Sequence, residues 1–328
     1  MNRPSINRRG FIKTIPAAAG AIALNSYAAQ DKSLIVEVHR PGITGKDNRP
    51  DATGAQQMLD KAMREFTGLT STKDQWAKFI KKDDVVGLKV NGLGGPKLST
   101  KKELIFAIIK RLVEFGVKEN NIIVWDDRQR CIRSIGMDEN LGNTGVRVYP
   151  TDHPSIGWEE KEYIFGSVPA NISKILANQI TAFINIPLLK DHRNSGSTIS
   201  MKNISHGITN RSNKFHENNC CPQIAEVNAT PLVQQKYRLT ILDAFQGCFN
   251  RGPGYSPSGV FNYDSLYIAT DRVALDTIGT SRIEAVRKSK DLLPFAEVGR
   301  PAKYIAEAAK LGLGTNDITK IEHRIVEG

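Results

Sequence analysis

Several features that would assign a function directly are absent from these 328 residues. The four cysteines, Cys131, Cys220, Cys221 and Cys248, do not form a ferredoxin-type run, and there is no haem-attachment motif, so the chain carries no iron–sulfur motif. Beyond the N-terminal segment, no apolar stretch approaches the roughly 20 residues that a membrane-spanning helix needs. No repeat recurs at a fixed period and nothing marks a linker between domains.

Acidic residues are outnumbered by basic ones, giving a formal net charge of +11, but the basic residues form no stripe. Pairs such as Lys81-Lys82 and Lys101-Lys102 are spread along the chain without interleaved aromatic residues. We therefore expect a solvated surface and no nucleic-acid partner. The excess of basic residues predicts only a mild preference for anionic small molecules or envelope polymers.

The N-terminal residues predict an export signal. A paired-arginine block at residues 7–13 precedes a weakly apolar stretch at 15–24, the order found in secretory signals. The block resembles the twin-arginine consensus, which makes the twin-arginine export machinery a partner. We predict a signal peptide at residues 1–28, a mature chain from Ala29 with a net charge of +7, and a periplasmic or extracellular location. The alternative, a membrane anchor, requires a longer apolar run, so no membrane span is expected in the mature form.

Residues 29–328 are predicted to form a single α/β domain. The clearest helix covers 102–115, where apolar residues recur at i, i+3 and i+4, and Gly116 is placed as its C-terminal cap. Further helices are predicted at 271–288, with Asp271 as N-cap, and at 301–311. Several predicted strands are continuous apolar runs, typical of a mainly parallel sheet with helices on both faces. The expected fold is doubly wound or a related three-layer α/β fold. The predicted strands cover 34–38, 85–90, 122–125, 146–149, 180–186, 239–242 and 266–269.

Polar residues follow five of these strands, where α/β sheets bind ligands. The residues at these positions are Lys89 and Asn91, Asp126 and Asp127, Lys190 to His192, Asp243, and Asp271. Simpler interpretations exist for single members, because Asp243 and Asp271 would also serve as caps and Asp126-Asp127 as a solvated turn. The turn at 92–95 is rich in glycine but lacks the spacing of a dinucleotide or Walker loop.

The densest polar cluster spans residues 190–207. If Ser197 or Thr198 opens a helix there, the free amides at its start form an anion pocket beside Lys190 and His192. Lys202 and His206 then lie on one helix face. A single histidine more often has a structural role, but two histidines and two lysines so close together favour a site.

These residues resemble a known family, the domain of unknown function family 362. The resemblance covers about residues 80–285, and the reaction of this family is not established. It rests on Gly87 to Asn91, Lys190-Asp191-His192, Thr198, Met201-Lys202-Asn203, Gly207, Asp243-Ala244, Gly252-Pro253-Gly254 and Ala269 to Asp276. Some relatives carry ferredoxin-like cysteine clusters, which this chain lacks, so an iron–sulfur role does not transfer.

The preferred hypothesis is an enzyme acting on a small carboxylated or phosphorylated molecule. Lysine and histidine side chains would fix the anion and exchange protons. The candidate catalytic residues are Lys190, His192, Lys202 and His206. The candidate substrate-binding residues are Lys89, Asn91, Asn203, Asp126, Asp243 and Arg251, the last on a Gly/Pro-rich loop at 250–259 that is a candidate lid.

Two other classes of function stay open. One is an exported metal or redox protein, in which His216 and Cys220 are candidate ligands. In the enzyme as in the metal protein, Asp126, Asp243 and Asp276 offer carboxylates that would orient a base or hold a divalent cation. The other is a binding module without catalysis, for a solute or a polymer. The sequence names no cofactor, substrate, disulfide pairing or oligomeric state.

Overall fold

The described part of the chain, residues 32–328 of the computed structural model, is built on a ten-stranded sheet. Eight strands follow the order β12-β1-β11-β10-β7-β2-β3-β4, while β8 pairs with β10 and β9 pairs with β8. The predicted signal peptide, residues 1–28, and the predicted mature start at Ala29 lie outside the described residues. The strands of the sheet are β1 (Ser33–His39), β2 (Val86–Lys89), β3 (Ile122–Trp125), β4 (Arg147–Val148), β7 (Ala182–Asn185), β8 (Leu188–His192), β9 (Gly196–Thr198), β10 (Tyr237–Cys248), β11 (Val260–Ala269) and β12 (Ile321–Glu327). A separate hairpin consists of β5 (Trp158–Phe165) and β6 (Val168–Ser173).

Most neighbouring strands run parallel. β10, β7, β2, β3 and β4 form a continuous parallel block, β12 is parallel to β1, and β8 is parallel to β10. The antiparallel pairs are β11 with β1 and β10, and β9 with β8. Strands β2, β3 and β7 are buried throughout, as their continuous apolar runs predicted. The predicted α/β fold with a mainly parallel sheet is confirmed.

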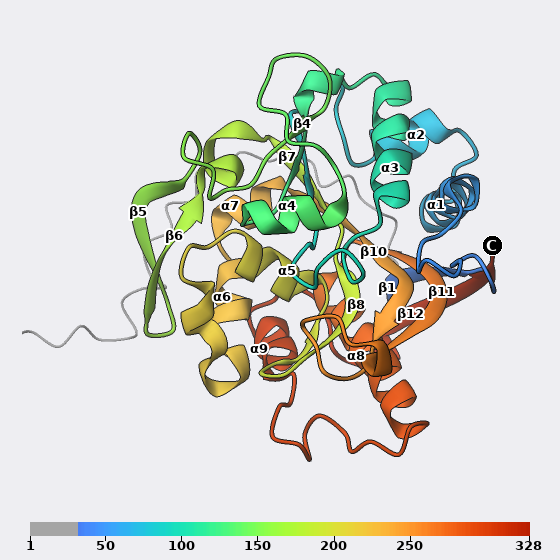
Figure 1. The fold of residues 1–328 in the computed structure, drawn as a ribbon, viewed down its shortest axis with the longest axis vertical. Helices are drawn as coiled ribbons and strands as arrows, with labels where there is room; N and C mark the ends of the chain where they lie inside the picture. Colours follow the sequence, from blue (N-terminus) through green and yellow to red (C-terminus); the bar gives the residue numbers. More distant parts are fainter. Residues whose placement is uncertain (1–31) are drawn as a thin grey trace, which may run out of the picture. The chain divides into compact units, whose positions relative to one another are not determined.

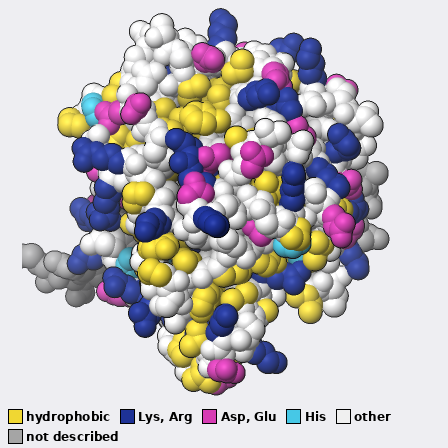
Figure 2. All heavy atoms as spheres, turned by 45° about the vertical axis from the view of Figure 1, so that its right-hand side comes forward, with side chains coloured by type: hydrophobic (Ala, Val, Ile, Leu, Met, Phe, Trp, Pro, Cys, Tyr) yellow, Lys and Arg dark blue, Asp and Glu magenta, His cyan; other side chains and the backbone are white. Residues whose placement is uncertain are grey.

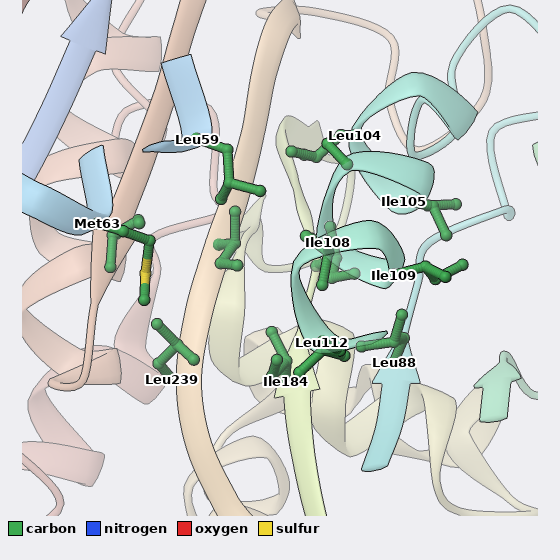
Figure 3. Packing of buried hydrophobic residues seen from close by; sticks show 14 of the residues in the cluster. Leu59, Met63, Leu88, Leu104, Ile105, Ile108, Ile109, Leu112, Ile184 and Leu239 are labelled. Atoms are coloured by element: carbon green, nitrogen blue, oxygen red, sulfur yellow. The ribbon is translucent and has the colours of Figure 1, made fainter. Parts of the chain in front are cut away.

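Helices α1 (Ala52–Thr67), α2 (Thr72–Ala77) and α3 (Lys102–Phe115) cover one face of the sheet (Figure 1). Helix α3 has the predicted bounds and ends at Gly116, whose left-handed φ of 119° lets its N–H bond the Leu112 carbonyl. Figure 3 shows Ile108 and Leu112 packed against Leu88 of β2 and Ile184 of β7. Burying one such side chain contributes about 1.5–3 kcal/mol.

A second layer covers the opposite face. Because side chains alternate along a strand, Ile123 and Phe183 point to this layer while Val124 and Ile184 point to α3. The helices of this layer are α5 (Ser200–Gly207), α6 (Gln223–Asn228), α7 (Pro231–Lys236), α8 (Arg272–Lys288) and α9 (Lys303–Lys310). Helix α4 (Gln129–Ile135) follows β3, and the short turns are η1 (Glu119–Asn121), η2 (Ile175–Gln179), η3 (Ser212–Cys220), η4 (Pro257–Gly259) and η5 (Ile318–Lys320).

The predicted cap of the second helix is confirmed, and the predicted start of the third is early. The Asp271 carboxylate accepts hydrogen bonds from the backbone N–H groups of Val273 and Ala274, which caps α8. Helix α9 begins at Lys303, so Pro301 lies before its first turn.

Two predictions about strand ends are wrong. Asp243 lies inside a strand, because β10 continues to Cys248 rather than ending at Leu242. Asp271 follows β11, which runs antiparallel to β10, so it lies at the opposite edge of the sheet from Asp126. Hydrophobic pattern alone does not give strand direction, and this is why both were misplaced.

The helix predicted to open at Ser197 or Thr198 begins at Ser200 instead. Residues Gly196–Thr198 form β9, which folds back on β8 with Lys190 opposite Thr198. The free amides at the start of α5 are already bonded, because the Asp276 carboxylate accepts from Ser200 N at 2.7 Å and from Met201 N at 3.1 Å. The anion pocket predicted at this helix start is therefore wrong.

Within residues 32–328, none of the helices combines the length and the apolar character that crossing a bilayer requires. On the face that Figure 2 shows, Lys and Arg side chains alternate with Asp and Glu and do not gather in a stripe. The four cysteines are free thiols in this structure.

Candidate functional site

A buried ion pair lies where β2 and β3 end. Lys89 Nζ donates to Asp126 Oδ1 and to the Val90 carbonyl, both at 2.7 Å, and Lys89 is fully buried. The second carboxylate oxygen of Asp126 accepts from Gly92 N at 2.8 Å. A side chain at Gly92 would overlap the backbone of Cys131, so this glycine allows the turn to approach α4. The glycine-rich turn thus positions Asp126.

Amide side chains extend this ion pair to a second lysine. Asn203 of α5 donates to Asn185 Oδ1 at 2.7 Å and accepts from Asn91 Nδ2 at 2.9 Å. Asn91 Oδ1 in turn accepts from Lys190 Nζ at 2.9 Å. Residues from β2, β7, β8 and α5 are thereby joined in one hydrogen-bonded network. Such a network is rigid only when each member is satisfied, as these members are.

A cavity of about 330 Å³ opens above this network. Its wall combines the ends of β2 and β3 with α5, the start of η3 and the loop between β8 and β9. The lining residues are Asn91, Leu93, Asp126, Asp127, Arg128, Arg130, His192, Arg193, Thr198, Lys202, Asn203, His206, Gly207, Ser212, Asn213, His216 and Pro253.

Lys202 and His206 form a pair at the wall of the cavity. One helical turn separates them on α5, and Lys202 Nζ lies 2.7 Å from His206 Nε2. Since an ammonium only donates, His206 Nε2 accepts, and His206 Nδ1 carries the proton that bonds Ser205 Oγ at 3.0 Å. Burial lowers the pKa of Lys202 to about 8 and lowers that of His206 well below its usual range.

Three imidazole rings meet in this cavity. The ring of His216 lies 5.3 Å from the rings of both His192 and His206, centroid to centroid. His216 Nδ1 donates to the Asn213 carbonyl at 3.0 Å, which leaves its Nε2 lone pair free. His192 Nδ1 accepts from Asn194 N at 3.1 Å, so its Nε2 carries the proton. Burial and neighbouring cations lower the pKa of His192 and His216, which keeps both rings neutral.

The candidate metal ligands His216 and Cys220 lie close together. Their ligand atoms and that of His206 lie within 4.8 Å of one another. Lys202 Nζ already bonds two of the three, since it lies 2.7 Å from His206 Nε2 and 3.4 Å from Cys220 Sγ. A positively charged group is thus positioned among the atoms that a metal ion would bind.

Two carboxylates lie beside the cavity at the end of β3. Burial and the charge of Asp126 raise the pKa of Asp127 to about 6. The same burial raises the pKa of the neighbouring Cys131 thiol, which donates to Asp127 Oδ1 at 3.5 Å. Asp126, Asp127 and Cys131 are a second group of ligand-type atoms within 4.8 Å, but Asp126 is already neutralised by Lys89.

Arginines surround the mouth of the cavity. Arg128, Arg130 and Arg193 are exposed and line it. Arg128 bonds Asp127 Oδ2 at 3.1 Å, whereas within residues 32–328 the side chains of Arg130 and Arg193 have no ion-pair partner. Together with Lys202, four cationic groups face two carboxylates, so the lining carries a positive excess.

The structure brings together most, but not all, of the predicted site residues. Asn91, Asp126, His192, Lys202, Asn203, His206 and His216 line the cavity. Lys89 and Lys190 lie beneath it in the network, and Cys220 is buried behind His206.

Three predicted residues lie away from the cavity. Asp243 is buried and accepts from Lys101 N at 2.7 Å, which fixes the start of α3. Asp276 caps α5 from α8. Arg251 is exposed outside the lining, and of its candidate lid loop only Pro253 reaches the cavity. Asp243, a candidate substrate-binding residue in the sequence, therefore does not line the cavity.

Three lining residues were not predicted individually from the sequence. Arg193 was included only in the polar cluster at 190–207, and Ser212 and Asn213 were not predicted as site residues. Ser212 and Asn213 line the cavity because η3 returns over α5. Farther along η3, Asn218, Asn219 and Cys220 adopt left-handed backbone, with φ of 47°, 58° and 63°. The Asn-Asn pair was an available signal, since asparagine tolerates this conformation better than most residues.

Residues 86–281 match the model of a family described as Domain of unknown function (DUF362). The chain belongs to this family. The DUF362 match includes every lining residue of the cavity and the whole of α5. The sequence resemblance, which covered about residues 80–285, is confirmed.

Among solved structures, a protein from Thermotoga maritima is similar to this DUF362 chain, with 12% sequence identity and a TM-score of 0.37. The match covers 71% of this chain and 59% of that one. No curated protein matches the chain.

Proposed function

We propose that this DUF362 protein is an enzyme that binds a small carboxylated or phosphorylated molecule in the cavity beside α5. Lys202 and His206 would exchange protons with the bound molecule. The observation that supports this most directly is a pair of fully buried lysines, Lys190 and Lys202, that have no carboxylate within ion-pair distance in the described part of the chain.

A buried ammonium without a counter-ion is costly, because it has lost its water and gained no opposite charge. In this site the two lysines bond an amide oxygen, an imidazole nitrogen and a cysteine sulfur, namely Asn91 Oδ1, His206 Nε2 and Cys220 Sγ. An anionic ligand in the cavity would supply the missing negative charge. Arg130 and Arg193 at the mouth would attract the same ligand.

The neutral histidines suit proton transfer. His206 Nε2 receives a hydrogen bond from Lys202, so a proton has a short path between the two groups. His192 Nε2 is a donor and His216 Nε2 an acceptor in the same cavity. The two rings thus offer one hydrogen-bond donor and one acceptor for orienting a polar ligand.

Titration calorimetry with inorganic phosphate at low salt tests anion binding. We expect the wild type to bind phosphate and Lys202→Met to lose most of that affinity, since it removes the charge but keeps a similar volume. Lys310→Met is the matched control, because the Lys310 side chain is 74% exposed. Equal binding by wild type and K202M would refute the proposed site. If the wild type binds phosphate but turns over no anionic metabolite, the result would favour a receptor over an enzyme.

Metal binding is the second candidate, favoured by the proximity of His206, His216 and Cys220. It requires Lys202 to give up its bonds to two of these residues. Elemental analysis of the purified protein, with Cys220→Ala as the comparison, separates the two proposals. One zinc or copper per chain that disappears in C220A would replace the proton-transfer proposal.

We also propose that the protein acts in the periplasm or outside the cell, supported by the twin-arginine pattern at residues 7–13. Replacing Arg8 and Arg9 together by lysine should keep the full-length protein in the cytoplasmic fraction. Unchanged export of that variant would refute the proposal.

A further inference from the structure

We propose that Lys202 is a nucleophile that forms an imine with the carbonyl carbon of a small aldehyde or ketone carrying a carboxylate or phosphate group. This inference rests on the proposed function and names the substrate class of the same site. It requires a buried amine that faces a cavity, a group that takes up its proton, and a donor for the carbonyl oxygen.

The surroundings of Lys202 meet the first requirement. Its side chain lines the cavity, yet the residue is only 2% exposed. In the part of the chain that the structure describes, no carboxylate lies within ion-pair distance of it, and its hydrogen-bond partners are His206 Nε2 and Cys220 Sγ. A desolvated lysine near a second cation is a recognised arrangement for an amine nucleophile. Lys190 supplies that nearby cationic charge.

His206 meets the second requirement. Its Nε2 lone pair lies 2.7 Å from Lys202 Nζ, and its own proton is held on Nδ1 by Ser205. His206 would receive the proton that nitrogen sheds as the new bond forms.

Thr198 meets the third requirement, through an independent observation. Its hydroxyl Oγ1 is buried and has no hydrogen-bond partner, although the residue lines the same cavity. Buried hydroxyls are rarely left unpaired, so this one awaits a partner from the ligand. The carbonyl or carbinolamine oxygen of a molecule in this cavity would accept from it.

The chemistry balances without any oxidant or reductant. The lone pair of the neutral amine attacks the carbonyl carbon, a C–N bond forms as the C=O π bond breaks, and His206 takes one N–H proton and returns it to the oxygen to give a neutral carbinolamine. His206 then passes the second N–H proton to that oxygen, which leaves as water as the C=N bond forms. The overall change is amine plus carbonyl giving imine plus water.

The anionic group of the substrate is inferred from the cavity mouth. Arg130 and Arg193 are exposed there without an ion-pair partner among residues 32–328, within the same lining as Lys202. Guanidinium groups bind carboxylate and phosphate through paired hydrogen bonds. The shared feature of the substrates is a carbonyl within a few bonds of such an anion.

Trapping with cyanoborohydride tests the inference on the full-length protein. Pyruvate serves as the carboxylate probe, dihydroxyacetone phosphate as the phosphate probe, and acetone as the neutral comparison. Intact mass and peptide mapping locate the reduced adduct. We expect at least one anionic probe to label Lys202. This labelling should be at least about tenfold faster than the labelling of Lys202 by acetone, and faster by the same factor than the labelling of any exposed lysine.

Lys202→Arg has no amine that forms an imine, so it should lose the label. Lys310→Arg, on an exposed face, should leave the labelling unchanged. The proposal that Lys202 is a nucleophile would be refuted if the label were spread over exposed lysines, or if neither anionic probe labelled Lys202. If phosphate binding persists in that case the anion site stands, and if Lys202→Met also leaves phosphate binding unchanged, both proposals fail.

Discussion

Lys89 Nζ lies 2.7 Å from Asp126 Oδ1 in an ion pair that is almost completely removed from solvent. This pair connects the ends of β2 and β3 beneath the cavity. Lys89→Met would leave the Asp126 charge buried with only backbone N–H partners, so we expect the free energy of unfolding to fall by about 3–5 kcal/mol. Urea unfolding measures this loss, and Lys310→Met, at an exposed site, should cost far less. A loss below about 1 kcal/mol for K89M would show that the pair is not structural.

Gly207 allows α5 to lie against Lys89. A methyl group at this position would overlap Lys89 Cε and Nζ, and Lys89 is held in place by Asp126. We expect Gly207→Ala to destabilise the protein by about 1–3 kcal/mol because of this overpacking. Gly254→Ala is the control, because nothing lies within 4 Å of the position of its added carbon. Equal stability of the two variants would contradict the close contact.

The carboxyl group of Asp276 should make stability depend on pH. Complete burial raises its pKa from 3.8 to about 7, with Tyr304 and Arg272 as its charged or titratable neighbours. Because the folded pKa is the higher one, its favourable contribution is complete below about pH 4 and is lost as pH rises through about 7. The shift corresponds to a loss on the order of 4 kcal/mol.

Asp276→Asn removes the ionisation, while its single amide oxygen still accepts one of the two hydrogen bonds from the start of α5. Unfolding by urea at about pH 4.5 and about pH 8 should show D276N gaining stability relative to wild type at the higher pH. Parallel pH profiles for the two proteins would show that the carboxyl is not the source.

Arg130 and Arg193 should contribute separately to anion affinity. Replacing either by alanine should weaken phosphate binding roughly 3- to 10-fold at low salt, with a smaller effect as ionic strength rises, because both groups are exposed. Arg133→Ala is the matched control on the same helix as Arg130, since Arg133 is exposed but outside the cavity lining. An effect of R133A as large as that of R130A would indicate a general charge effect instead of a site.

The parts of the site that depend on local pattern were predictable from the sequence. The spacing of Lys202 and His206 required only that a helix form there, and the polar residues after β2 and β3 required only that these strands be parallel neighbours. Helix α3 was predicted with its bounds because its apolar face and its C-terminal glycine agree.

The remaining errors concern long-range geometry. Asp243 and Asp271 were placed with the site because strand direction and strand length were not visible in the apolar runs. Asp276 was read as a carboxylate for catalysis, although α8 brings it to the start of α5 from 76 residues away in the sequence. Burial of Cys220 depended on three consecutive left-handed residues, which hydrophobic periodicity does not report.

The position of β1 determines the order in which the sheet is completed. β1 lies between β11 and β12, and the contact from Glu37 to Ser265 spans 228 residues. A ribosome therefore has to synthesise nearly the whole described chain before β1 gains either neighbour. The parallel block that carries Lys89, Asp126 and Asn185 has much shorter loops to close. During synthesis we expect the parallel block beside the cavity to assemble first. Strand β1 would stay unpaired and accessible to chaperones until β11 and β12 have been synthesised.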